Sequence, residues 1–264
     1  MRRATLFGYA IATDPLETLG VGVMDSAEAG KEPHFLVAMN PVKVMYAERD
    51  PRLHEALTRA TVLYPDGYGI CWAFRIVTGL KVPRVPGVDL AQFLLSEAER
   101  RGKSVYLLGA APDVNRAATE TVRRRHPRLR IAGAQHGYFA RADEERIVRS
   151  IRESRADVIL VAMGSPRQEE WIDEHLGDLG VGVALGVGGT FDVLAGAARR
   201  APRPVQNLGL EWAWRAVGQP AKVRRLLATR PHFVLKTLRE AIRHRGRGGD
   251  AESAPLNGGN ESRP

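Results

Sequence analysis

Several short segments of this 264-residue chain place polar or glycine residues directly after apolar runs. Asp66 follows such a run within Tyr-Pro-Asp-Gly-Tyr-Gly, and Gln168 lies within Gly-Ser-Pro-Arg-Gln-Glu. A carboxylate can take a proton from a hydroxyl group, and an amide can bind a sugar or phosphate oxygen. Because ligands of open α/β sheets bind at the carboxyl ends of the strands, both residues are well placed for chemistry.

Two glycine-containing turns suit a phosphate or a ribose. Gly109-Ala110-Ala111-Pro112 joins an apolar run to a helical segment, where backbone N–H groups can bind a diphosphate. Residues 186–192, Gly-Val-Gly-Gly-Thr-Phe-Asp, permit a ligand to approach the backbone closely, with Asp192 within reach of ribose hydroxyls. The full G-x-G-x-x-G dinucleotide pattern is not met.

Each segment also has a purely structural interpretation. Pro-Asp-Gly at 65–67 is typical of a turn, in which Asp supplies a side-chain hydrogen bond and Gly a positive φ. Ser165 can cap a helix that begins at Pro166, and the helix dipole then stabilises Glu169 and Glu170. The two glycine-containing turns can likewise be structural turns that bind no ligand. Taken singly, the segments leave both interpretations open.

The segments that must position these residues alternate between strand and helix. Apolar runs predict strands at His34–Met39, Thr61–Tyr64, Ser104–Gly109, Arg130–Ala134, Val158–Ala162 and Gly182–Gly186. Amphipathic spacing predicts helices at Val88–Arg101, Asp113–Arg125 and Asp143–Arg155. The alternation predicts an α/β fold with a Rossmann-like, mainly parallel sheet flanked by helices. Residues 8–32 indicate no clear element.

Positive charge is concentrated in one segment. Residues 199–247 hold 13 Lys and Arg against 2 Asp and Glu, a net charge of +11, whereas residues 1–198 are neutral. This concentration indicates a localised anionic partner. Within Pro231–Arg245, helical spacing places Leu235, Leu238 and Ile242 on one apolar stripe.

These patterns also predict the domain organisation. We expect an α/β catalytic domain over 1–198, a basic helical appendage over 199–245 and a disordered tail over 246–264, where Gly, Ser and Asn dominate.

Several other kinds of site and segment have no signature in the sequence. Cys71 is the only cysteine, which fits a reducing compartment, and we interpret it as a small buried residue of a helix. No Cys/His spacing fits zinc, and no Walker A, G-x-S-x-G, EF-hand or D-x-D pattern occurs. We therefore expect neither a metal nor another cofactor. No apolar run is long enough to span a bilayer, and we recognise no secretory signal.

A series of motifs resembles the WecG/TagA/CpsF glycosyltransferase family over about Phe35 to Leu227. The motifs are Asn40-Pro41, Pro65–Gly69, Arg84–Leu90, Leu107–Gly109, His136–Phe139, Gly164–Glu169, Gly186–Asp192, Arg200–Pro202, Leu210–Trp212 and Gln219-Pro220. Each is short, but their order and spacing together are specific. The chain departs from the family's usual hydroxyl residues at Ala38, Pro86 and Val88, which bears on the sugar that it uses.

The resemblance implies an inverting transferase in cell-surface polysaccharide or teichoic acid biosynthesis. It would move a hexose-type sugar, such as N-acetylmannosamine or its uronic acid, from a UDP-sugar to an undecaprenyl-diphosphate-linked sugar. By their positions in the motifs, Asp66 would be the catalytic base and Arg84 would neutralise the departing diphosphate, while Asn40 and Gln168 would orient donor or acceptor. The implied nucleotide pocket consists of Gly109, Gly137, Tyr138, Gly164, Gly188, Gly189 and Asp192.

The resemblance further implies a peripheral protein on the cytoplasmic face of the membrane, held there by its terminal appendage. Basic residues near an anionic leaflet contribute about 1 kcal/mol each. Arg215, Arg224, Arg225 and Arg230 are the candidates for binding the lipid diphosphate or the membrane. A solvated basic face packed on the body of the protein is the alternative, and a homo-oligomer remains open.

Two other functions compete with this one. A nucleic-acid-binding protein would use the Arg-rich C-terminal segment, but would leave the glycine-rich turns unexplained. An NAD(P)-dependent oxidoreductase would place its cofactor on the same Rossmann-like sheet. We expect a UDP-sugar, a polyprenyl-diphosphate-linked acceptor and an anionic membrane surface as partners, and no nucleic acid.

Overall fold

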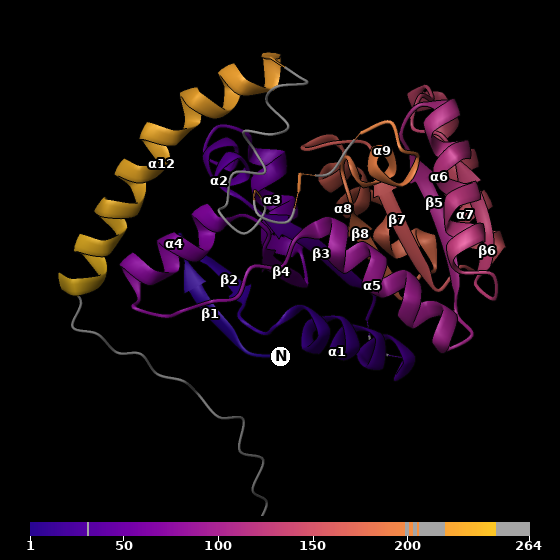
Figure 1. The fold of residues 1–264 in the computed structure, drawn as a ribbon, viewed down its shortest axis with the longest axis horizontal. Coiled ribbons are helices and arrows are strands. Elements are labelled where there is room, and N and C mark those ends of the chain that lie inside the picture. Colours follow the sequence, from indigo (N-terminus) through magenta and orange to yellow (C-terminus); the bar gives the residue numbers. More distant parts are fainter. Residues whose placement is uncertain (31, 199–200, 203–204, 206–219, 247–264) are drawn as a thin grey trace, which may run out of the picture.

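The computed structural model describes residues 1–30, 32–198, 201–202, 205 and 220–246, with residues 220–230 and 246 described by their backbone alone. Its centre is an eight-stranded sheet in the order β1-β2-β4-β3-β8-β7-β5-β6 (Figure 1). Of the strand pairs in these residues, only β1 with β2 is antiparallel. The strands are β1 Arg3–Leu6, β2 Tyr9–Ala12, β3 His34–Met39, β4 Val62–Pro65, β5 Ser104–Gly109, β6 Arg130–Gln135, β7 Val158–Ala162 and β8 Val183–Gly186.

Helices cover both faces of this sheet (Figure 1). On one face, α2 Pro41–Ala47, α3 Pro51–Arg59, α4 Tyr68–Val77, α7 Glu144–Ser154, α8 Arg167–Leu179 and α12 Pro220–Gly246 contribute to one apolar cluster. On the other face, α1 Leu16–Glu28, α5 Gly87–Arg100, α6 Pro112–Arg125 and α9 Thr190–Leu194 contribute to a second cluster. A short 3₁₀ helix, Arg141–Asp143, precedes α7.

The central strands are apolar throughout because both of their faces are covered. All five residues of β7, Val-Ile-Leu-Val-Ala, are buried, as are all six of β5. Continuous apolar runs of this kind are typical of parallel sheets buried between helices. The flanking helices bury only one side: α7 packs Ile147, Val148 and Ile151 against the sheet and leaves its charged residues outside.

The predicted fold class is confirmed, and each predicted central strand and helix is present with ends that differ by at most one residue. The N-terminal region, which gave no clear sequence pattern, forms the β1–β2 hairpin and α1. Its hairpin turn places Phe7 at φ 54° and Gly8 at φ 83°. The expected cap of α8 was wrong: the helix begins at Arg167, and no side chain caps it.

The C-terminal helix α12 lies along α4 and α2 at one side of the molecule (Figure 1). Phe233 is buried and packs edge-to-face on Phe7, with 5.5 Å between the ring centroids, and Lys236 forms an ion pair with Glu48. Among the described helices, none combines the length and apolar character needed to cross a membrane. The expected tail beyond residue 246 lies outside the described residues, and the domain boundaries stay predictions.

Candidate active site

Most of the predicted site residues gather at one edge of the sheet. Because β4, β3, β8, β7 and β5 are parallel and adjacent in that order, the loops that follow them are also neighbours. Along this edge lie, in order, Asp66, Asn40, Gly188 and Gly164, which follow their strands, and Gly109, the last residue of β5. Residues separated by more than a hundred positions in the sequence are thus brought to one surface.

Near the centre of this edge, adjacent strand ends lead to helices on opposite faces of the sheet. From β3 the chain continues into α2 on one face of the sheet, whereas from the neighbouring β8 it continues into α9 on the other. Two adjacent strand ends whose connections go to opposite faces leave a crevice between them, and this is where open α/β sheets bind ligands. Asn40 and Gly188 flank this position.

Asp66 directly follows β4, and its carboxylate is held in place. Its Oδ1 accepts a hydrogen bond from the Gly87 N–H at 2.8 Å, and its own N–H donates to the Met39 carbonyl oxygen at 3.0 Å. A side chain at position 87 would put its first atom 3.3 Å from the Tyr64 hydroxyl and 3.9 Å from Asp66 Oδ1. The glycine therefore lets the start of α5 approach the Tyr64 hydroxyl closely.

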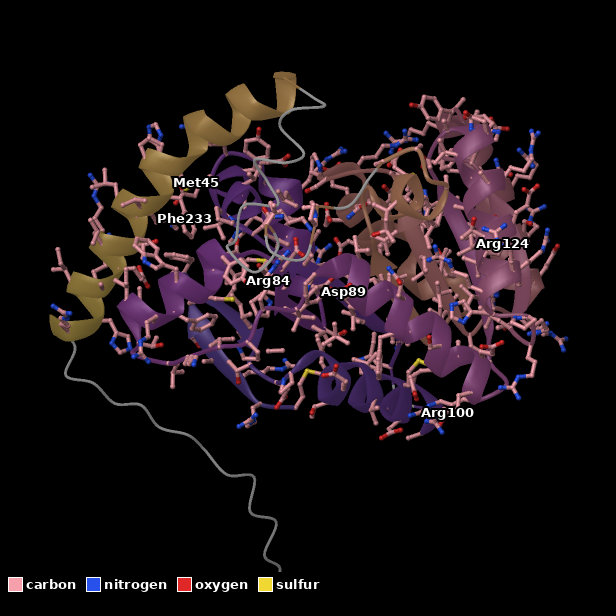
Figure 2. All side chains as sticks on the ribbon, in the orientation of Figure 1. Met45, Arg84, Asp89, Arg100, Arg124 and Phe233 are labelled. Carbon is pink, nitrogen blue, oxygen red and sulfur yellow. The ribbon has the colours of Figure 1, made fainter. Side chains whose placement is uncertain are left out.

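Arg84 reaches the same place from the segment between α4 and α5 (Figure 2). Its Nε donates to the backbone carbonyl oxygen of Asp66 at 2.8 Å, and its guanidinium carbon lies 4.9 Å from the centre of the Tyr68 ring. Next in the chain, the Val85 N–H donates to the Pro65 carbonyl oxygen at 2.8 Å. The Arg84 guanidinium and the Asp66 carboxylate are therefore both held at residue 66, the first by its carbonyl oxygen and the second by the Gly87 N–H.

Tyr64 lies beneath Asp66 and is fully buried. Burial, together with the negative charges of Asp66 and Glu169, raises the pKa of the Tyr64 hydroxyl well above its usual value, so the group is neutral. No described residue forms a hydrogen bond with this hydroxyl. Sequence reasoning missed Tyr64, because an aromatic residue at the end of an apolar strand is typical of a core position.

Asn40 begins the neighbouring helix. Its side-chain Oδ1 accepts a hydrogen bond from the Lys43 N–H at 3.0 Å, which makes it the N-cap of α2, with Pro41 as the first helical residue. This cap orients Asn40 at the carboxyl end of β3.

Gln168 is only 3% exposed, and protein groups bind its amide. Its Oε1 accepts from the Gly188 N–H at 3.0 Å and from the Gly164 N–H at 3.2 Å, and its Nε2 donates to Glu169 Oε1 at 2.8 Å. A side chain at position 186 would come within 2.7 Å of Gln168 Nε2. One amide therefore joins the loops that follow β7 and β8.

The loops after β5 and β6 also approach one another closely. Gly109 has φ 120°, and a side chain there would come within 2.4 Å of the Ala162 carbonyl oxygen. The Gly137 N–H donates to the Ala110 carbonyl oxygen at 2.9 Å, and a side chain at 137 would come within 3.0 Å of the Gly109 Cα. Both positions thus require glycine for packing, whatever they bind.

The remaining nucleotide-pocket candidates lie on the surface of these loops. Tyr138 is 73% exposed. Gly164 and Gly188 have positive φ, and the first has open space where a side chain would be. Beside them, Asp192 lies in the first turn of α9, with Oδ2 3.5 Å from the position that a side chain on Gly189 would take.

Sequence reasoning missed three buried polar groups that support these loops. Asn115, on α6, donates to the carbonyl oxygens of Leu107, Gly109 and Gln135. Lys43 and Glu169 form an ion pair at 2.8 Å with both side chains buried. A lysine on the buried side of the helix that Asn40 caps was the available signal for this pair.

The structure bears on the predictions about a metal site and about Cys71. The described residues contain no group of three or more His, Cys, Asp or Glu side chains placed to hold a metal ion. Metal independence nevertheless stays a prediction. Cys71 lies in α4, and burial raises the pKa of its thiol to about 11, which keeps it protonated and unreactive near neutral pH.

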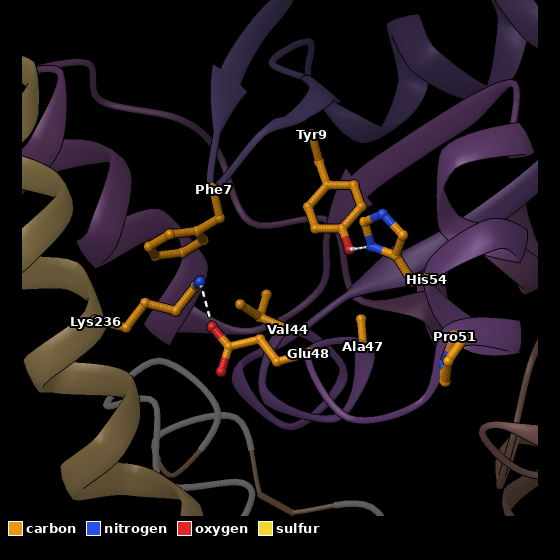
Figure 3. Close-up of a pocket in the computed structure, with 8 residues that line it drawn as sticks. All are labelled: Phe7, Tyr9, Val44, Ala47, Glu48, Pro51, His54 and Lys236. Carbon is orange, nitrogen blue, oxygen red and sulfur yellow. Dashed lines mark hydrogen bonds and ion pairs between the residues drawn. The ribbon is translucent and has the colours of Figure 1, made fainter.

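Two pockets in the described part of the chain lie away from this edge. One of about 420 Å³ lies between the β1–β2 turn, α2, α3 and α12, where Figure 3 shows the Tyr9–His54 hydrogen bond and the Lys236–Glu48 pair. The other, of about 350 Å³, includes Lys103 and Asp157. Neither contains a predicted site residue, so the candidate site is defined by the strand ends.

The predicted membrane-contacting arginines cannot be placed by their side chains. Arg215 lies outside the described residues, and Arg224, Arg225 and Arg230 belong to the part of α12 described by its backbone alone. Farther along α12, the predicted apolar stripe of Leu235, Leu238 and Ile242 is exposed, Ile242 at 72%.

A comparison with known protein families finds one that matches the chain over most of its length. The model of the glycosyl transferase WecG/TagA/CpsF family matches residues 4–247, which include all of α12 and all of the strands except Arg3, the first residue of β1. The match covers most of the chain, and it favours sugar transfer in cell-surface polysaccharide synthesis over nucleic-acid binding or nicotinamide-dependent oxidation. The chain belongs to the WecG/TagA/CpsF family of glycosyltransferases.

Proposed function

We propose that this protein transfers a hexose-type sugar, N-acetylmannosamine, its uronic acid or a close relative, from a UDP-sugar to a polyprenyl-diphosphate-linked sugar, with inversion at C1. The observation that carries the proposal is the position of Asp66: a carboxylate fixed by the Gly87 N–H at the end of β4, next to the adjacent ends of β3 and β8. Family membership supplies the reaction class.

In the proposed reaction, the acceptor hydroxyl oxygen attacks C1 of the donor sugar. As the new C1–O bond forms, the bond from C1 to the diphosphate breaks, and UDP leaves with the electron pair. Asp66 takes the hydroxyl proton, which increases the negative charge on the attacking oxygen. Attack from the side opposite the leaving group inverts the configuration at C1.

The departing diphosphate needs positive charge or N–H donors, because one further negative charge develops on this already anionic group as its bond to C1 breaks. Arg84 supplies a guanidinium close to Asp66, held by the Asp66 carbonyl oxygen and the Tyr68 ring. The Gly164 and Gly188 N–H groups bind Gln168, so the other N–H groups of the turns after β8, β7 and β5 are the proposed diphosphate donors. Asp192 is the proposed ligand of the ribose hydroxyls. The mechanism needs no metal ion.

The acceptor is lipid-linked, and we propose that α12 brings the protein to the cytoplasmic face of the membrane. The face of α12 that carries Phe233, Thr237 and Ala241 is buried against the body, while Leu235, Leu238 and Ile242 are exposed. Arg239, Arg243 and Arg245 are interspersed with this exposed stripe. An apolar stripe among basic side chains suits an anionic leaflet.

Two measurements test the proposal in sequence. Calorimetric titration should show binding of UDP, and no comparable binding of NAD⁺, NADP⁺ or duplex DNA at moderate salt. A panel of UDP-sugars, each incubated with a short-chain prenyl-diphosphate sugar, should then yield one mass increase equal to the transferred sugar. Absence of UDP binding, or binding of NADP⁺ in its place, would refute the proposal.

A further inference from the structure

We infer that Lys43 and Glu169 are positioning residues of the donor site: they fix the Gln168 amide, and this amide holds two glycine turns in register. The inference rests on the proposed function, because it assigns these turns to the uridine diphosphate. Neither Lys43 nor Glu169 belongs to the predicted pocket, and both are buried, at 4% and 0% exposure.

The two charges belong to different helices that begin at the same edge of the sheet. Lys43 is in the first turn of α2 after β3, and Glu169 is in the first turn of α8 after β7. Their side chains meet with Lys43 Nζ 2.8 Å from Glu169 Oε1. A buried ion pair is a weak source of stability, because removing both charges from water costs about as much as their attraction returns. A role in orientation explains its presence better.

The orientation of Gln168 depends on this pair. Glu169 Oε1 accepts hydrogen bonds from both Lys43 Nζ and Gln168 Nε2. An acceptor at this point decides which end of the Gln168 amide is the NH₂ group, since only that end can donate. The opposite end, Oε1, must then face Gly164 and Gly188, whose N–H groups both donate to it.

A series of contacts therefore links Lys43 on α2, through Glu169 and Gln168, to the turns at Gly164 and Gly188. It also reaches the acceptor side, because the N–H of Lys43 is the group that Asn40 caps. Without the acceptor on residue 169, the Gln168 amide could rotate and present its NH₂ group to the two glycine N–H groups. Two donors facing each other in a buried place repel, so the turns would separate and bind the diphosphate less well.

Two double variants isolate this effect. Lys43→Met/Glu169→Gln removes both charges at similar volume but keeps an oxygen that can accept from Gln168. Lys43→Met/Glu169→Leu removes the charges and the acceptor together. Ser104→Ala is the control, since it removes a buried hydroxyl that bonds Asp157 Oδ2 at the opposite, amino-terminal edge of the same sheet.

UDP binding by calorimetry and donor kinetics are measured on all four proteins. We expect the Gln variant to bind UDP within about threefold of wild type and the Leu variant to bind it about tenfold more weakly, the scale of one misplaced buried hydrogen bond. Its donor KM should rise by a similar factor with kcat little changed. Ser104→Ala should lower Tm without changing either constant. A merely structural role would lower Tm in the Leu variant and leave its UDP affinity intact.

Failure of the inference and of the proposed function give different results. If wild type does not bind UDP, the proposed function fails. If wild type binds UDP and both double variants bind it equally well or equally poorly, the inference fails. Should the Leu variant not fold, Glu169→Asp replaces it: the charge opposite Lys43 stays, while the oxygen withdraws from Gln168 by one methylene. Wild-type UDP affinity in Glu169→Asp would overturn the inference.

Discussion

Arg84 donates a hydrogen bond from Nε to the backbone carbonyl oxygen of Asp66, at 2.8 Å. The proposed base and the cation proposed for the departing diphosphate are therefore tied to the same peptide. The Gly87 N–H donates to the Asp66 carboxylate, so residues 84–87 contact both the backbone and the side chain of Asp66. The spacing between proton removal and leaving-group stabilisation is thus set by the backbone.

Replacement of Arg84 by lysine should lower kcat by about 10²-fold, because lysine keeps the charge but loses the planar guanidinium that bonds Asp66 and stacks on Tyr68. Steady-state kinetics with saturating donor measure this effect. Arg75→Lys, at an exposed position of α4, is the matched control and should retain wild-type turnover. Equal kcat values for Arg84→Lys and Arg75→Lys would show that Arg84 does not stabilise the departing diphosphate.

Transfer should continue in the presence of EDTA. The proposed mechanism neutralises the diphosphate with Arg84 and backbone N–H groups, so chelation of divalent ions should leave the rate within about twofold of the untreated enzyme. The measurement compares initial rates before dialysis against EDTA, after it, and after addition of Mg²⁺. A rate that falls to background and returns with Mg²⁺ would contradict metal-independent transfer.

The exposed stripe of α12 should bind anionic vesicles. Leu238→Asp/Ile242→Asp places two carboxylates on this stripe and should reduce cosedimentation with phosphatidylglycerol vesicles at least about tenfold. Arg124→Gln/Arg123→Gln changes the net charge by the same amount on α6, far from α12 (Figure 2), and should bind as wild type does. Equal loss in both variants would indicate a general charge effect in place of a stripe.

Stability at acidic pH should depend on Glu97. Hydrogen bonds from Arg100 and Arg101 lower the pKa of Glu97 from 4.5 to about 2, and Arg101 also binds Asp25 and Glu28 on α1. A lowered pKa stabilises the fold above the unfolded value near 4.5, and this contribution is lost as the pH falls toward 2. Glu97→Gln should therefore cost about 1–2 kcal/mol at pH 7, after allowance for solvent screening, and should flatten the loss between these pH values.

Urea unfolding between pH 2 and 7 measures this dependence. Glu145→Gln, at an exposed position of α7, serves as the comparison and should leave the curve unchanged. Parallel pH curves for wild type and Glu97→Gln would contradict the prediction, because they would show that the hydrogen bonds from Arg100 and Arg101 to Glu97 do not affect the pH dependence of stability.

The central sheet could be predicted because each of its strands is a continuous apolar run bounded by turn residues. The β1–β2 hairpin could not, since its strands have four residues each and its turn, at Phe7 and Gly8, lacks the Asn-Gly or Asp-Gly signal of such turns. The start of α8 was misjudged because Ser165 is typical of an N-cap, yet here its hydroxyl is buried away from the helix N–H groups.

The edge of the site could likewise be predicted, because a residue that follows a parallel strand has a known position. What supports the edge could not. Lys43 and Glu169 pair across two helices, and the contact depends on where the sheet places the first turns of α2 and α8 rather than on any local pattern. The sequence predicted that the Gln168 amide binds donor or acceptor, but its bonds to Gly164 and Gly188 depend on the three-dimensional fold and could not be predicted.

The most direct test of the account compares wild type with Asp66→Asn in transfer from the matching UDP-sugar to a prenyl-diphosphate sugar, with UDP binding measured on the same samples. Asparagine keeps an oxygen for the Gly87 N–H but cannot take a proton at neutral pH. We predict unchanged UDP affinity and a fall in kcat of about 10³-fold or more. Turnover within a few-fold of wild type would show that Asp66 is not the base.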